Sequence, residues 1–223
     1  ALEDGGYVVS WHTAAEDGSY YDIAAQIFDG NNDPVDGGEI ALNSIRGHHQ
    51  FEPSISALST GGFVAGWHSY NYDTATYDVF VRRFDATGAA LDDVEVLANQ
   101  YTGGTQSNVS LVGLADGGYL TAWTSEGQDG SGNAIYARRF NAAGQASGDE
   151  FRVNDLTSHS QFTPEMTALE DGSVAISWTS DREDGSSHGT YAKVYRFTDE
   201  GMVVAGTAGD DVLRGGSGND TLQ

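Results

Sequence analysis

The chain has 223 residues, and its 39% hydrophobic and 11% aromatic content is enough to fill a core, which excludes a disordered segment. Its 33 acidic against 10 basic residues give a formal charge of -23, which argues against nucleic acid or an anionic membrane as a partner. The lack of cysteine excludes disulfides, thiolate metal sites and cysteine catalysis. No apolar run is long enough to predict membrane insertion, and the start at Ala1 without a signal peptide suggests a fragment or a processed piece.

The four tryptophans recur at a nearly constant interval, which indicates a sequence repeat. Trp11, Trp67, Trp123 and Trp178 are 56, 56 and 55 residues apart. Their surroundings superpose without a gap, as in "ALEDGGYVVSWHT" at residues 1–13 and "ALSTGGFVAGWHS" at 57–69. We therefore predict four copies of one unit, with boundaries at 1–56, 57–112, 113–167 and 168–205.

Each copy contains four predicted strands separated by turn signals. Around Trp67, for example, the predicted strands are at residues 53–58, 63–69, 77–85 and 94–99. Four antiparallel strands in about 50 residues form the unit of a β-propeller blade. The second strand is bulky on the tryptophan side and small on the other, as expected of a sheet buried on both faces. The predicted fold is all-β, a β-propeller of about four four-stranded antiparallel blades; a sandwich or a β-solenoid array is the alternative.

The first copy is incomplete, because the chain opens in its second strand. Either the stretch near residues 202–207 closes the ring, or further blades precede this one in a longer parent. The sequence leaves both possibilities open.

The chain ends with two nine-residue units, "GTAGDDVLR" at 206–214 and "GGSGNDTLQ" at 215–223. They resemble the calcium-binding nonapeptide of RTX proteins, which bacteria export in one step. The resemblance implies the start of an RTX β-roll at 206–223, Ca²⁺ as cofactor, and a secreted, extracellular protein. It also implies calcium ligands at Asp211 and Asp220, assisted by Asp210, with weak binding because two units supply at best half a site. A disordered acidic tail is the alternative. The upstream copies resemble tandem units of large secreted bacterial proteins.

Two further groups are candidate binding residues. Asp17, Asp129 and Asp184 open Asp-Gly-Ser loops that could hold calcium, although an Asp-Gly turn needs no ion. Four loop tyrosines are candidates for stacking on a ligand: Tyr20, Tyr70, Tyr72 and Tyr101.

The sequence contains no recognisable catalytic motif, and its four loops look nearly equivalent, whereas catalysis needs one copy that differs. We therefore predict that the chain is not an enzyme. The expected function is a non-catalytic extracellular binding or structural module of a secreted calcium-binding RTX-type protein, adhesin- or lectin-like, with a glycan or cell-surface protein as partner. The alternative is a propeller-type polysaccharide-degrading enzyme, a lyase or hydrolase, using carboxylates with His12 or His68.

Overall fold

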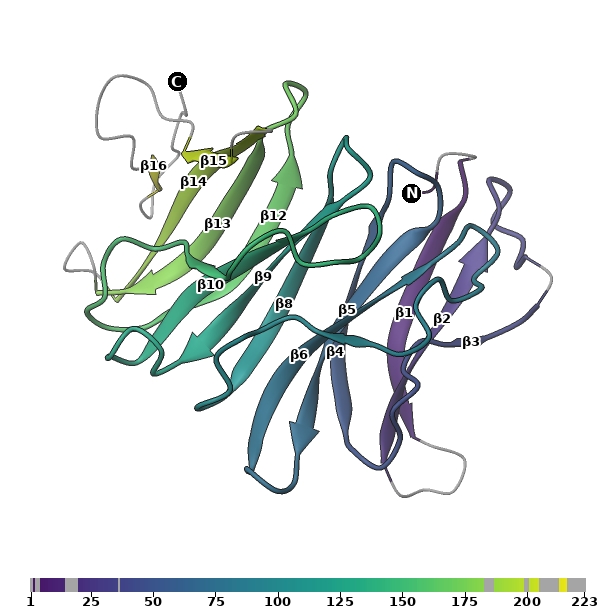
Figure 1. Ribbon diagram of the computed structural model, residues 1–223, viewed down its shortest axis with the longest axis horizontal. Helices are drawn as coiled ribbons and strands as arrows, with labels where there is room; N and C mark the ends of the chain where they lie inside the picture. The colour runs from purple at the N-terminus through teal and green to yellow at the C-terminus, as the bar shows by residue number, and fades with distance from the viewer. Residues whose placement is uncertain are drawn as a thin grey trace.

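The computed structural model describes residues 2, 5–14, 20–35, 37–182, 187–198, 201–204 and 213–215. All regular elements in these ranges are β-strands, and they form four antiparallel sheets, which confirms the all-β prediction (Figure 1). None of the described residues forms a helix long and apolar enough to cross a membrane.

The sheets follow one another along the chain, and in each of them neighbouring strands are consecutive, except that β16 of the last sheet pairs with β14. Sheet 1 comprises β1 (Tyr7–Ala14), β2 (Tyr21–Phe28) and β3 (Ile40–Ala41). Sheet 2 comprises β4 (Gln50–Ala57), β5 (Phe63–Asn71), β6 (Thr76–Phe84) and β7 (Val96–Leu97). Sheet 3 comprises β8 (Gln106–Gly113), β9 (Tyr119–Glu126), β10 (Asn133–Phe140) and β11 (Phe151–Arg152). Sheet 4 comprises β12 (Gln161–Ala168), β13 (Val174–Asp181), β14 (His188–Thr198), β15 (Gly201–Val204) and β16 (Leu213–Gly215).

The sheets stand face to face in a row, with sheet 1 and sheet 4 at its two ends (Figure 1). The row is open, so the described residues do not form a closed ring. Sheet 1 has three strands because no described strand pairs with the free edge of β1.

The hydrophobic core consists of three layers, one between each pair of neighbouring sheets. In each layer a bulky face packs against the small face of the preceding sheet, as Trp67 of sheet 2 does against Ala25 of sheet 1. Trp67, Trp123 and Trp178 are buried accordingly. The expectation that Trp11 is equally buried is wrong: it is half-buried, because its face of sheet 1 points out of the row and no described residues cover it.

A carboxylate joins each of the first two pairs of sheets. Glu95, which is only 6% exposed, accepts hydrogen bonds from the amides of Ser44 (3.0 Å) and Ile45 (2.8 Å) in sheet 1 and from the Ser44 hydroxyl. In the same way, Glu150 of sheet 3 accepts hydrogen bonds from the main-chain amides of Gln100 (2.6 Å) and Tyr101 (3.0 Å), which follow sheet 2. We call each arrangement a seam clamp.

A basic side chain crosses every boundary beside the clamp position. It donates to a main-chain carbonyl of the preceding sheet in three pairs: Arg82 to Leu42 (3.0 Å), Arg138 to Ala98 (3.1 Å) and Lys193 to Val153 (2.9 Å). Each boundary between neighbouring sheets therefore contains a recurring polar contact as well as an apolar core layer.

Replacing Glu95 with alanine is expected to lower the free energy of unfolding by about 1.5–3 kcal/mol, because two part-buried amides lose the charged acceptor that a buried side chain supplies. Glu39 holds the equivalent position in sheet 1 but is exposed, so Glu39→Ala should stay within about 0.5 kcal/mol of wild type. Urea unfolding of the two variants in dilute solution tests this. Equal losses would show that the clamp does not stabilise the boundary.

In the last sheet a strand from the first nonapeptide, β16, pairs at the position that the fourth strand holds in sheet 3. In sheet 3, β11 pairs with β10 through Tyr136↔Arg152. In sheet 4 the matching pair is Tyr191↔Arg214, which belongs to β16 within the first nonapeptide at 206–214. The predicted boundary at residue 205 therefore separates two strands, β15 and β16, that pair with the same strand, β14.

Candidate functional site

The first strands of sheets 2, 3 and 4 share an irregularity at one position. Their pairing register shifts between residues 51 and 54, 107 and 110, and 162 and 165. In each shift one non-glycine residue adopts a left-handed backbone: Glu52 (φ 50°), Asn108 (φ 52°) and Thr163 (φ 56°). Such a conformation costs on the order of 1–3 kcal/mol, so its recurrence at one place marks a β-bulge built into the repeat.

The three bulges lie side by side and enclose a polar pocket, because β4 contacts β8 and β8 contacts β12. The pocket has a volume of about 270 Å³. It is lined by Glu52, Pro53, Ser54, Asn108, Val109, Thr163, Pro164 and Glu165. We call it the bulge pocket. It contains two exposed carboxylates, Glu52 and Glu165, from the first strands of sheet 2 and sheet 4.

Glu52 is held between an amide and an imidazole. The side-chain amide of Asn108 donates to its Oε2 (3.3 Å), and Nδ1 of His68 lies 3.9 Å from the same oxygen. His68 is 7% exposed, and its Nδ1 has no hydrogen-bond partner among the described residues. Burial lowers the pKa of His68; Glu52 opposes that shift and His12 adds to it. The buried imidazole therefore loses its charged form more readily than an exposed histidine does.

A continuous group of rings surrounds His68 and extends to the surface. Its members are His12, Tyr20, Tyr21, His48, His49, Phe51, His68, Tyr70, Tyr72 and Tyr77. We call this group the aromatic cluster; it lies where the end of β1, the start of β2 and the β5–β6 turn meet the start of β4, at the lower end of sheets 1 and 2 in Figure 1. Phe51 links it to the pocket, because its ring is 6.0 Å from that of His68 and the next residue is Glu52.

Three of the four predicted stacking residues meet in this cluster. The ring centroids of Tyr20 and Tyr72 are 5.9 Å apart, and those of Tyr70 and Tyr72 are 4.9 Å apart. Tyr72 is 49% exposed, which leaves part of a ring available to a ligand. Tyr101 lies elsewhere, in the loop after β7, where its amide donates to Glu150 (3.0 Å).

Most of the predicted calcium ligands lie outside the described residues: Asp17, Asp184, Asp210, Asp211 and Asp220. Asp129 is described, and its Oδ1 accepts the amide of Ser131 (3.1 Å), the arrangement of an Asx turn. Within the described ranges no three His, Asp or Glu residues are grouped so as to hold a metal ion. Calcium binding by these residues stays a prediction.

Sequence reasoning did not single out Glu52, Asn108 or Glu165. One signal was present: copies 1 and 2 are rich in tyrosine and histidine near the pocket, whereas copies 3 and 4 are not. The structure therefore contains the asymmetry that seemed to be lacking, because the aromatic cluster belongs to sheets 1 and 2 alone.

Comparison with known proteins separates the chain into two parts. Residues 203–223 match the family of the RTX calcium-binding nonapeptide repeat (four copies), so the C-terminal segment consists of RTX-type repeats. No curated protein matches the chain.

The four sheets resemble solved glycoside hydrolases. A thermostable family-43 glycoside hydrolase has a TM-score of 0.56 at 12% identity, covering 92% of this chain and 73% of that one. An exo-1,5-alpha-L-arabinanase from a bovine ruminal metagenomic library has a TM-score of 0.55 at 8% identity, and the match covers 92% of this chain and 76% of that one. An endo-arabinase from Bacteroides thetaiotaomicron has a TM-score of 0.53 at 16% identity, and the match covers 92% of this chain and 80% of that one.

These similarities correct the predicted function. The expectation of a non-catalytic adhesin- or lectin-like module that is not an enzyme is contradicted, because the similar structures are a family-43 glycoside hydrolase, an endo-arabinase and an exo-arabinanase, which favour the alternative of a polysaccharide-degrading enzyme. At 8–16% identity the likeness concerns the fold. The four sheets of the chain thus have a fold similar to that of these glycoside hydrolases, and the C-terminal segment consists of RTX-type repeats.

Proposed function

We propose that this chain is a polysaccharide-hydrolysing domain whose catalytic site is the bulge pocket. One observation carries the proposal: the pocket supplies two carboxylates, Glu52 and Glu165, and the buried imidazole of His68 lies 3.9 Å from one of them, Glu52. Hydrolysis of a glycosidic bond needs two carboxyl groups, one that protonates the leaving oxygen and one that acts at the sugar carbon or on its water.

The surroundings of the two carboxylates suggest their roles. Asn108 orients the Glu52 carboxylate through a hydrogen bond, and the bulge fixes its backbone, so Glu52 is assigned to the sugar carbon or its water. Glu165 enters from β12 on the other wall of the pocket and is assigned as proton donor to the leaving group. His68, whose imidazole is buried beside Glu52, limits the access of water to that side of the carboxylate.

The aromatic cluster is the proposed contact for the polysaccharide chain. Tyrosine rings offer an apolar face to a sugar and a hydroxyl to water. Tyr72 and Tyr21, which are 49% and 40% exposed, would carry sugar units beyond the pocket. The negative charge of the protein, -23, favours a neutral polysaccharide over an acidic one.

The RTX repeats support an extracellular location for this activity. Such repeats bind calcium, and in this chain Asp211 and Asp220, assisted by Asp210, would be side-chain ligands. We also propose that the four sheets are blades of a propeller whose axis passes through the bulge pocket. Secretion would then deliver a polymer-degrading site to polymers that cannot enter a cell.

The test is turnover of polymers by the purified protein in the presence of calcium. Arabinan and xylan serve as neutral substrates and alginate as an acidic one, and new reducing ends are measured. We expect release from a neutral polymer, with saturated products, as hydrolysis requires. Folded protein that releases nothing from any polymer would contradict the proposal, and unsaturated products would identify a lyase instead.

A further inference from the structure

His68 occupies a position of the repeat that lies beside the bulges. Its equivalent in sheet 3 is Thr124, because each of the two pairs with the residue directly before a bulge. The Thr124 hydroxyl accepts a hydrogen bond from the amide of Thr163 (3.2 Å), the bulge residue of the next sheet. Thr179 holds the same position in sheet 4. Sheets 3 and 4 thus accept a threonine where sheet 2 has an imidazole.

The Glu52 carboxylate stands between two possible partners in two different sheets. Its Oε2 lies 3.3 Å from the side-chain amide of Asn108 in sheet 3 and 3.9 Å from Nδ1 of His68 in its own sheet. The first distance is that of a long hydrogen bond, and the second is too long for one. The Glu52 side chain is 59% exposed and therefore free to move. A small movement toward sheet 2 would exchange one partner for the other.

Nδ1 of His68 faces this carboxylate from a buried position. The residue is 7% exposed, and Nδ1 has no hydrogen-bond partner among the residues that the structure describes. A neutral imidazole has a single N–H, whereas a protonated imidazole donates from both nitrogens. Protonation therefore guarantees a donor at Nδ1 and adds a charge opposite to that of Glu52, which strengthens and shortens the hydrogen bond between them.

Ionisable groups act on His68 from three neighbouring strands. They are His12 of β1, Glu52 of β4, and Tyr77 of β6, whose ring centroid is 4.9 Å from that of His68. Burial lowers the pKa of His68, Glu52 raises it, and His12 lowers it further. Glu165 stands across the bulge pocket on β12. Of these groups, Glu52 is the one that favours the protonated imidazole most directly.

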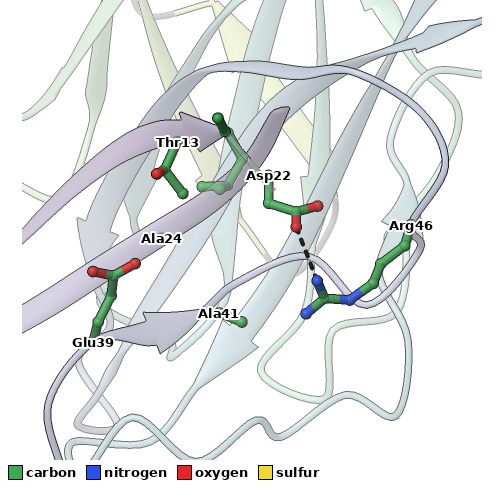
Figure 2. A pocket seen from close by; sticks show the side chains of 8 residues that line it. Thr13, Asp22, Ala24, Glu39, Ala41 and Arg46 are labelled. Atoms are coloured by element: carbon green, nitrogen blue, oxygen red, sulfur yellow. Dashed lines mark hydrogen bonds and ion pairs between the residues drawn. The ribbon is translucent and has the colours of Figure 1, made fainter. Parts of the chain in front are cut away.

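Other charged groups of sheet 1 lie on its opposite face (Figure 2). The Asp22–Arg46 ion pair (2.9 Å) and Glu39 line a separate pocket there. Successive side chains of a strand point to opposite faces, so His12 points away from that pocket. Its ring lies 5.6 Å from that of Phe51 in sheet 2. Sheet 1 therefore stands between these charges and the buried imidazole.

We propose that His68 is a positioning residue that acts as the acid switch of the bulge pocket. In mild acid its imidazole takes up a proton from solvent, donates through Nδ1 to Glu52 and draws this carboxylate away from Asn108. At higher pH the imidazole gives up the proton, and Glu52 returns to Asn108 and the substrate. No covalent bond forms or breaks. The inference rests on the proposed catalytic role of Glu52.

The direction of the pH dependence follows from the burial of the imidazole. Because burial lowers the pKa of His68, it takes up its proton below about pH 6.5, the ordinary pKa of a histidine. An ion-paired Glu52 is less able to act at the sugar carbon or on its water. Turnover by the wild type should therefore fall up to about tenfold for each pH unit below the pKa of His68, as for a single ionisation.

An NMR titration of the histidine ring protons tests the contact in the whole chain without a substrate. The signal of His68 is the one missing from His68→Thr, which carries the residue of sheets 3 and 4 at this position, and from His68→Gln, which is closer in size. In Glu52→Gln the pKa of His68 should fall further, because the carboxylate that favours the charged imidazole is gone. Glu126→Gln, at an exposed carboxylate outside the pocket, should leave it unchanged. An unchanged pKa of His68 in Glu52→Gln, or an equal change in Glu126→Gln, would overturn the proposal.

The pH profile of turnover then tests the switch itself on a polymer that the wild type cleaves. His68→Thr should keep its turnover to lower pH than wild type. His188→Thr, the same replacement at an exposed histidine, should follow wild type. A His68→Thr profile identical to that of wild type would exclude the switch and leave the proposed role of Glu52 intact. Protein that cleaves no polymer would contradict the proposed function, whereas the titration would still decide whether protonated His68 pairs with Glu52.

Discussion

Replacing Glu52 with glutamine is expected to lower kcat/KM on a cleaved polymer by about 10²–10⁴-fold, the usual contribution of a positioned acid or base. Glutamine keeps the shape of the side chain and its approach to Asn108, so the pocket should keep its geometry. It cannot accept or donate a proton as a carboxyl group does. Binding of the polymer, measured separately, should change little.

The control for this variant is Glu126→Gln. Glu126 is also exposed, and at the end of β9 it accepts a hydrogen bond from the amide of Thr105 (3.1 Å), but it does not line the bulge pocket. Its replacement should leave turnover unchanged. A Glu52→Gln protein that binds and cleaves as well as wild type would remove Glu52 from the reaction, whatever the role of Glu165.

Replacing Trp123 with alanine is expected to lower the free energy of unfolding by about 3–5 kcal/mol, as for other large buried side chains. Trp123 is fully buried between sheets 2 and 3, so its loss leaves a cavity bounded on both sides. Trp11 occupies the equivalent place in sheet 1 but is half-buried, and solvent can fill the space it leaves. Trp11→Ala should cost clearly less.

Urea unfolding of the two variants at low protein concentration compares identical substitutions at two copies of one position. Equal losses of stability for Trp11→Ala and Trp123→Ala would contradict the packing scheme, because they would mean that Trp11 is covered in the isolated chain.

The repeat of tryptophans correctly predicted four antiparallel sheets, because residues at equivalent positions of a repeat occupy equivalent positions in their own sheets. It could not report whether another sheet lies opposite. Trp11 has the same neighbours in sequence as Trp67, yet it is half-buried because no described sheet precedes it. Similarly, no pattern predicted that β16, within a nonapeptide, would complete sheet 4.

The candidate site was harder to foresee for two physical reasons. A left-handed backbone is usually signalled by glycine, whereas here it falls on Glu52, Asn108 and Thr163. The aromatic cluster joins rings from β1, β2, β4, β5 and β6, and only the packing of sheet 1 on sheet 2 brings them together. Tyr20, Tyr70 and Tyr72 were identified singly, as loop tyrosines, but their proximity was not.

The bulges also bear on how such a repeat can change during evolution. The backbone at residues 52, 108 and 163 has nearly the same φ angle although the side chains are Glu, Asn and Thr. The strand pairing on both sides holds this conformation, so the position of each Cβ does not depend on which side chain it carries. A lineage can therefore exchange an acid, an amide and a hydroxyl among these three points by single substitutions, and so acquire or lose a chemistry without rebuilding the sheets.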